Sequence, residues 1–137
     1  MKEADIVVTA TNSSEPVVKA EWLGKGQHVN AIGANALDRR ELDNASYLKA
    51  DLVAIDHREQ GMIEAGALST LVGAGKLRWA QIAELGEIVG GQRKGRTGAD
   101  QLTLFNSLGI GFEDVAYGYS LYLKAKERGM GKEVELG

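Results

Sequence analysis

The chain has no cysteine and only one proline among its 137 residues. The absence of cysteine excludes disulfide bonds and thiol chemistry and makes a cytoplasmic location the default expectation. No apolar run approaches the roughly 18 residues that a membrane-spanning helix requires, and the first five residues lack the apolar segment of a secretory signal. The net charge of -3 does not favour nucleic acid as a partner. We therefore expect neither a membrane nor a nucleic-acid partner, and no metal site.

Glycine, in contrast, is abundant, with 18 residues. This excess over proline indicates many tight turns or close backbone approaches, as in nucleotide-binding α/β proteins. Hydrophobic residues make up 44% of the chain and charged residues 26%, which is ordinary for a soluble globular protein. The length suits one compact domain, so we expect residues 1–137 to form a single domain.

Short apolar and β-branched runs alternate with segments of helical periodicity. This alternation predicts an α/β fold with a mostly parallel sheet of about four strands and flanking helices. The predicted strands are residues 5–10, 28–32, 51–56 and 102–106, and residues 133–136 could add an edge strand. The predicted helices are a short one with Pro16 at its first position, then residues 39–49 capped by Asp38, 57–66, 67–72, 79–89 and 114–126.

Small and polar residues follow several of the predicted strands. Thr11 to Ser14 follow the first strand, Gly33 follows the second, and Ser107 to Gly111 follow the last. Ligands of open α/β sheets bind beyond the carboxyl ends of the strands. The loop that begins at Gly33 is therefore our first candidate site, although the Thr11 to Ser14 run could equally be a solvated turn.

Other polar features have structural interpretations that we prefer. A histidine within a strand, such as His28, is more often packed and hydrogen-bonded than a ligand. Asp56 is expected to cap the following helix rather than to act in catalysis, because no partner residue converges on it in the sequence. The glycine-rich segment 90–98 is expected to be a solvated loop, and Tyr117, Tyr119 and Tyr122 to pack in the core or at an interface. Modest anion-binding candidates in that loop are Arg93, Lys94 and Arg96.

Three separated segments resemble one known family. They are ADIVVTATNSSEPVVKAEWL, HVNAIGANALDRRELD and GRTGADQLTLFNSLGIGFEDVA, and their order is that of the ornithine cyclodeaminase and mu-crystallin family. The resemblance extends from Ala4 to about Gly131 but corresponds only to the carboxyl-terminal part of a family member. It implies the second half of a Rossmann-type NAD(P)-binding domain, in a lineage of NAD(P)-dependent imine reductases, amino-acid dehydrogenases and cyclodeaminases.

The resemblance also assigns residues to a site. Thr9, Thr11 and Gly33 match cofactor-facing positions, and Ser107 and Leu108 match the turn beside the nicotinamide. Cyclodeaminases have an aspartate that acts on the substrate and a basic residue four positions later near the cofactor. Asn35 and Arg39 stand at these two positions here. An amide cannot exchange a proton near neutral pH, so Asn35 can bind a substrate but cannot be a general base.

The pyrophosphate-binding motif of a dinucleotide fold is absent. None of the G-x-G occurrences continues to the third glycine of G-x-G-x-x-G, and no P-loop motif exists. We therefore expect the chain alone to bind NAD or NADP poorly or not at all, and not to be catalytically competent alone. The alternatives are a non-enzymatic module that self-associates as a homodimer or higher oligomer, and a domain that binds a small anion at Asn35, Arg39 and Ser107. An amino acid or imine is the ligand that the resemblance implies.

Overall fold

Five parallel strands form one sheet in the computed structural model, which describes residues 3–135. The sheet confirms the expected α/β fold and has one strand more than the sequence indicated. Every pair of neighbouring strands is parallel, as expected for strands joined by helical crossovers. In spatial order the strands are β1 (Ile6–Thr9), β2 (His28–Ala31), β5 (Thr103–Asn106), β3 (Leu52–Ile55) and β4 (Ala83–Glu84).

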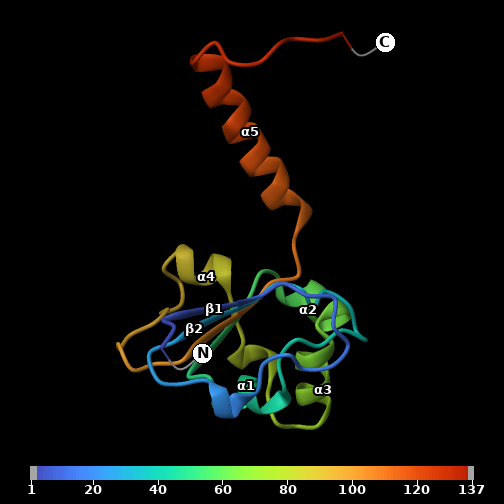
Figure 1. Cartoon of the computed structure of the whole chain (residues 1–137), viewed down its shortest axis with the longest axis vertical. Coiled ribbons are helices and arrows are strands. Elements are labelled where there is room, and N and C mark those ends of the chain that lie inside the picture. The colour runs from blue at the N-terminus through green and yellow to red at the C-terminus, as the bar shows by residue number, and fades with distance from the viewer. Residues whose placement is uncertain (1–2, 136–137) are drawn as a thin grey trace.

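One face of the sheet is buried by helices and the other is largely open. Alternate strand residues, such as Val7, Val29 and Leu104, point into the core and meet Tyr47 of α1 (Asn44–Lys49) and Leu68 of α3 (Gly66–Gly73). Figure 1 shows α1 and α3 on one side of the sheet and α4 (Leu85–Val89) on the other. On that other side, Ile6 and Val8 of β1 are 61% and 58% exposed.

Helix α1 begins later than its sequence predicted. Asp43, not Asp38, is its N-cap, and the Asp43 carboxylate accepts a hydrogen bond of 2.9 Å from the Ser46 N–H. Leu42 precedes the helix in an extended bridge to Val18. The predicted start of this helix at residue 39 was therefore wrong. The helix buries Ser46 and Tyr47 and leaves Ala45 and Leu48 exposed.

The predicted helix over residues 79–89 was also wrong. This segment consists of a 3₁₀ turn at Trp79–Gln81, the strand β4 and the short helix α4. A strand forms here because Ile82 and Ala83 are fully buried beside β3, while Val89 is 81% exposed and supplies no core contact. The predicted helix starting at Pro16 is likewise only a 3₁₀ turn, Ala20–Trp22.

The remaining helices lie close to their predicted positions. Helix α2 (Arg58–Glu64) is followed directly by α3, and α5 (Gly111–Glu127) starts three residues before the predicted position 114. No strand forms over 133–135, and Leu136, the end of that predicted strand, lies outside the described residues. Within residues 3–135, no helix combines the length and apolarity needed to cross a bilayer.

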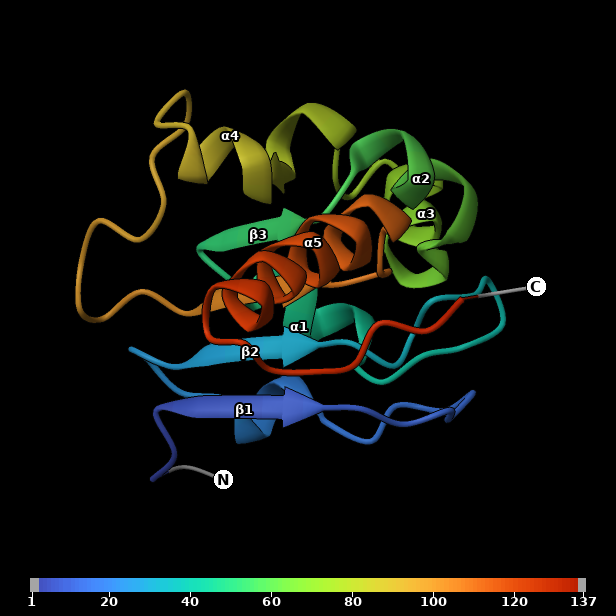
Figure 2. The ribbon, with the colours of Figure 1, turned by 90° about the horizontal axis from the view of Figure 1, so that it is seen from above.

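Helix α5 leaves the body of the molecule. Figures 1 and 2 show it rising from the open side of the sheet, over the region between β2 and β3. None of its residues is buried. Tyr117, Tyr119 and Tyr122 do not pack in the core, since these side chains are 68%, 62% and 53% exposed. Their packing at an interface stays a prediction.

Candidate functional site

The turns that follow β1, β2 and β5 lie side by side at the carboxyl edge of the sheet. The Ile32 N–H donates to the Thr9 carbonyl over 3.0 Å, and the Ser107 N–H donates to the Ala31 carbonyl over 2.9 Å. Backbone hydrogen bonds thus tie each turn to the next strand end. The edge at which α/β sheets bind ligands is continuous across these three strands.

The side chain of Glu41 joins the first two turns. Its carboxylate is fully buried and accepts hydrogen bonds from the Thr9 hydroxyl at 2.8 Å, from the Gly33 N–H at 2.8 Å and from the Thr11 N–H. Burial opposes the charge, but these hydrogen bonds outweigh it, so the pKa of Glu41 lies below its ordinary value. The carboxylate therefore stays ionised and fixes both turns.

Gly33 allows this close approach of the two turns. A Cβ at this position would overlap the Thr11 backbone and the Glu41 carboxylate. The residue after β2 must therefore lack a side chain if the turns after β1 and β2 are to pack together.

Asp56 holds the turn after β5. Its carboxylate accepts from the Ser107 hydroxyl at 2.9 Å and from the N–H groups of Leu108 and Gly109, each at 2.8 Å. His57, not Asp56, is the N-cap of α2, so the predicted capping role of Asp56 was wrong. A carboxylate in this position organises the turn from the neighbouring strand β3.

The seven residues predicted for the site range from buried to exposed. Thr9 and Leu108 are buried, and Gly33 is partly buried against Thr11. At the same edge, Thr11 and Asn35 are exposed, and Arg39 and Ser107 are half-buried.

Asn35 and Arg39 contact each other at that edge. The Arg39 guanidinium donates to the Asn35 amide oxygen over 3.3 Å. Asn35 lies in the loop where it was expected, whereas Arg39 lies in the same loop and not in the predicted helix. This hydrogen bond occupies the amide oxygen of Asn35. The amide nitrogen of Asn35 is a donor that suits a carboxylate, and the arginine is a fixed positive charge beside it.

Two carboxylates at this edge were missed by sequence reasoning. Glu41 was considered only as part of a helix, and Glu113 only as a residue before one. Burial, together with the negative charges of Asp56 and Asp114, raises the pKa of Glu113. The only sequence signal for Glu41 was an acidic residue next to apolar Leu42.

Tyr47 and Asn106 form a buried polar pair beneath the turns. The Tyr47 hydroxyl donates to the Asn106 amide oxygen over 2.6 Å, and both side chains are at least 98% buried. Burial, and then the charge of Glu41, raises the pKa of Tyr47, so this hydroxyl remains a donor. The pair fastens α1 to the end of β5.

The preferred structural interpretation of His28 is confirmed. Its ring nitrogens contact the Thr103 hydroxyl at 2.7 Å and the Asn30 amide oxygen at 3.1 Å. Segment 90–98 begins at the end of α4 and contains no strand or longer helix. Arg96 from that loop donates to the carbonyls of Gly26 and Gln27.

The edge suits part of a nicotinamide cofactor. The accessible amide and guanidinium groups of Asn35 and Arg39 and the Ser107 hydroxyl can bind a ribose, a ring carboxamide or a substrate carboxylate. The N–H groups of Leu108 and Gly109 are already used by Asp56, and no G-x-G-x-x-G turn is present to hold a diphosphate. Within residues 3–135, no group of histidine and acidic side chains is arranged to hold a metal ion.

The family profile of the ornithine cyclodeaminase/mu-crystallin family matches residues 1–129. The chain is 38% identical over 136 residues to a Delta(1)-pyrroline-2-carboxylate reductase of Bacillus cereus, covering 98% of this chain and 42% of that one. The structure of the corresponding Thermococcus litoralis enzyme in complex with NADH and L-proline matches with a TM-score of 0.85 at 38% identity, covering 96% of this chain and 41% of that one.

The iminosuccinate reductase of Paracoccus denitrificans in complex with NAD+ matches with a TM-score of 0.84 at 32% identity, covering 98% of this chain and 41% of that one. The chain thus spans about two fifths of the length of these relatives. The family match covers nearly all of its residues, and its parallel α/β sheet is shared with them. The chain belongs to the ornithine cyclodeaminase/mu-crystallin family.

Proposed function

We propose that the chain forms the nicotinamide side of the active site in an NAD(P)-dependent imine reductase or amino-acid dehydrogenase, and that it is not catalytically competent alone. The observation that supports this most strongly is the edge itself. Two buried carboxylates, Glu41 and Asp56, hold the three strand-end turns together and leave Asn35, Arg39 and Ser107 accessible. Such a rigid wall with few polar groups positions a ring and a small substrate.

The chemistry of the accessible residues favours reduction over cyclodeamination. A bound nicotinamide would supply or accept the hydride. Asn35 can donate from its amide to a substrate carboxylate, and Arg39 can neutralise that carboxylate's charge. Neither group can take up and return a proton near neutral pH, which a cyclodeaminase base must do. The proposed ligand is therefore a small imine or amino acid with a carboxylate.

The absence of the diphosphate-binding G-x-G-x-x-G motif is the reason for expecting no activity from the chain alone. Each lost charge-assisted hydrogen bond to a diphosphate costs about 1.5 to 3 kcal/mol, so several of them reduce affinity by orders of magnitude. The choice between NAD and NADP depends on contacts to the adenosine ribose, which dinucleotide folds make from a residue about 20 positions after the glycine motif that this chain lacks. A cytoplasmic location fits such an enzyme and the absence of cysteine.

A second candidate function is a self-associating module without catalysis. It is supported by the exposed apolar side chains of α5 and by the open side of the sheet. A homodimer or higher oligomer would cover part of this surface. Light scattering separates this candidate from the first, because a clean monomer at high concentration would count against self-association.

Isotope-edited NMR with nicotinamide mononucleotide tests the first proposal, since the chain is small at 14.7 kDa. We expect weak binding that shifts the amide signals of the turns after β1, β2 and β5, including Thr11 and Asn35. Arg39→Ala should weaken these shifts, whereas Lys76→Ala, which removes an exposed cation in the turn after α3, should leave them unchanged. Shifts confined to other regions, or equal shifts with adenosine monophosphate, would contradict the proposal.

A further inference from the structure

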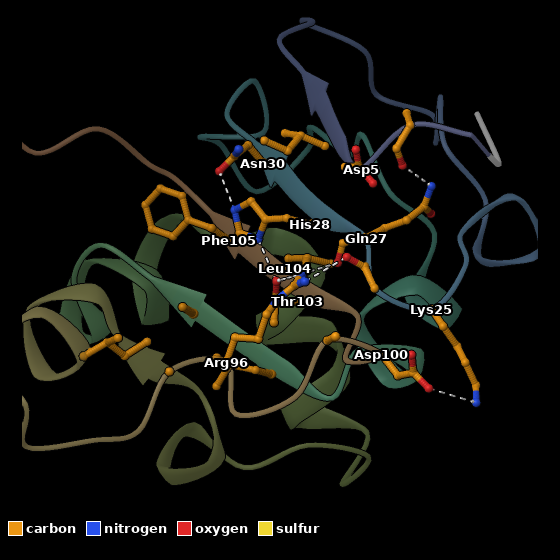
Figure 3. A pocket seen from close by; sticks show the side chains of 18 of the residues that line it. Asp5, Lys25, Gln27, His28, Asn30, Arg96, Asp100, Thr103, Leu104 and Phe105 are labelled. Carbon is orange, nitrogen blue, oxygen red and sulfur yellow. Dashed lines mark hydrogen bonds and ion pairs between the residues drawn. The ribbon is translucent and has the colours of Figure 1, made fainter.

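The open side of the sheet forms a hollow of about 1120 Å³. Figure 3 shows His28, Asn30 and Phe105 at this hollow, on the strands β2 and β5. A sheet face without covering helices is unusual in parallel sheets, which are buried on both sides in α/β proteins. Apolar side chains that line the hollow are Ile6, Leu52, Leu85, Ile88 and Phe105.

Strand β1 is also a free edge. The Asp5 carbonyl accepts a hydrogen bond from His28 of β2, and the Thr9 carbonyl accepts one from Ile32, the residue after β2. Because alternate residues of a parallel strand bond to the same neighbour, the peptide groups of Ile6 and Val8 face away from β2. Within residues 3–135, no strand pairs with that side of β1. The side chains of Ile6 and Val8 are apolar, and β1 contains no charged residue or proline that would discourage pairing with a further strand.

The connections in the molecule indicate which face an additional unit would cover. Crossovers from β2 to β3 and from β3 to β4 move in one direction along the sheet, and their helices α1 and α3 cover the buried face. The crossover from β4 back to β5 moves in the opposite direction, and its helix α4 lines the hollow on the other face. This is the outcome of right-handed crossovers.

The same rule applies to strands added beyond β1. If added strands continue outward from β1, the connections between them run along the sheet in the same direction as the connection from β4 to β5. Right-handed connections in that direction place their helices on the face that contains the hollow. Helix α5 stands on that side and exposes a stripe that repeats every three or four residues. Members of the stripe are Phe112, Val115, Tyr119, Tyr122 and Leu123, which are 46% to 72% exposed.

A second copy of the chain does not fill this space by pairing at β1. A symmetric edge contact between identical strands is antiparallel, about a two-fold axis perpendicular to the sheet. Such an axis keeps the faces of the two sheets on the same sides. Both hollows would therefore remain open, and both β1 strands would lose the parallel arrangement seen throughout this sheet.

We propose that β1, the hollow and the stripe of α5 together bind a separate α/β segment, which adds parallel strands beside β1 and places its helices over the hollow. The length of the relatives supports this occupant, because 58% of the Bacillus cereus reductase (100% less the 42% covered) has no counterpart in this chain. The added strand would create a switch point in strand direction beside Thr11 and Gly33, where dinucleotides bind. This inference rests on the proposed function and names the partner that completes the site.

Co-expression of the 137-residue chain with the unmatched part of the Bacillus cereus reductase tests the proposal. We expect a one-to-one complex on size exclusion with light scattering. Val8→Asp at the free edge and Tyr119→Asp on α5 should each weaken it by about tenfold or more, because both place a charge in an apolar contact. Val134→Asp, an exposed apolar position in the carboxyl-terminal segment, is the matched control and should not change it.

Circular dichroism of each variant checks that the chain remains folded. The proposal is overturned if the folded chain forms no complex, if it forms only a homodimer, or if Val8→Asp and Tyr119→Asp leave the complex intact. NADH fluorescence separates this inference from the proposed function. A complex that forms but does not bind NADH supports the docking surface and contradicts the proposed function. Amide shifts on adding nicotinamide mononucleotide, without any complex, support the proposed function and contradict the docking surface.

Discussion

Replacing Glu41 by glutamine should destabilise the chain by about 3 kcal/mol. The carboxylate accepts hydrogen bonds from Thr9, Thr11 and Gly33, but a glutamine side chain has only one acceptor oxygen. If that oxygen keeps the bonds from Thr9 and Gly33, the amide nitrogen faces the Thr11 N–H. One charge-assisted bond worth about 1.5 to 3 kcal/mol is then lost, and the other two weaken to neutral strength.

Urea denaturation of wild type and Glu41→Gln measures this difference through the transition midpoint. Thr9→Val is the matched control, since it removes only one of the three donors and should cost about 1.5 kcal/mol, the lower end for a hydrogen bond to a charged group. A Glu41→Gln variant within about 0.5 kcal/mol of wild type would show that the carboxylate does not hold the two turns.

The pH dependence gives an independent check of the same group. The folded-state pKa of Glu41 is lowered, so the unfolded chain binds a proton first as the pH falls. The stability from this carboxylate is thus fully present above its unfolded pKa of about 4.3 and is lost as the pH falls through the lower folded-state value. Glu41→Gln should flatten this part of the wild-type stability profile, and an unchanged slope would contradict the reasoning.

Three further predictions concern the same edge. Asp56→Asn should lower the free energy of unfolding by about 2 kcal/mol, because an amide group replaces one carboxylate oxygen and faces the N–H groups of the turn after β5. Faster hydrogen exchange of the Leu108 N–H would show that this turn has loosened. Unchanged exchange would contradict the prediction. Gly33→Ala should lower the free energy of unfolding in thermal denaturation by about 3 kcal/mol, because the added methyl group overlaps the Thr11 backbone. Gly118→Ala in the exposed helix α5 should be neutral or stabilising. Equal effects of the two substitutions would refute the packing argument. Tyr47→Phe should cost about 1 kcal/mol in urea denaturation, since the Asn106 amide oxygen loses its buried donor, and no loss would show that this hydrogen bond adds nothing.

Local sequence patterns predicted the strands well but the helices unevenly. The runs at 28–32 and 102–106 are apolar and β-branched and form β2 and β5 within one residue of the prediction. The segment 79–89 has equally clear helical spacing, yet Ala83 and Glu84 become a strand because the edge of β3 is available for pairing. Pairing between distant segments overrides local propensity, and no local pattern shows it.

The candidate site could be located from the sequence but not its internal support. Small residues after strands identified the turns at Gly33 and Ser107, because parallel strand ends must share an edge. The two carboxylates that hold these turns, Glu41 and Asp56, lie 8 and 51 positions away from the groups that they bind. Asp56 was interpreted as a helix cap because a cap is the local use of an aspartate after a strand. The assignments of Asn35, Arg39 and the other five site residues stay predictions.

The most direct test of the account compares NADH with nicotinamide mononucleotide as ligands of the isolated chain by isothermal titration calorimetry. In the proposed function the turns after β1, β2 and β5 contact the nicotinamide half of the cofactor, and the chain has no G-x-G-x-x-G turn to bind the diphosphate. The account therefore predicts that both ligands bind weakly and with similar affinity. Micromolar NADH binding, about a hundredfold tighter than the mononucleotide, would contradict it.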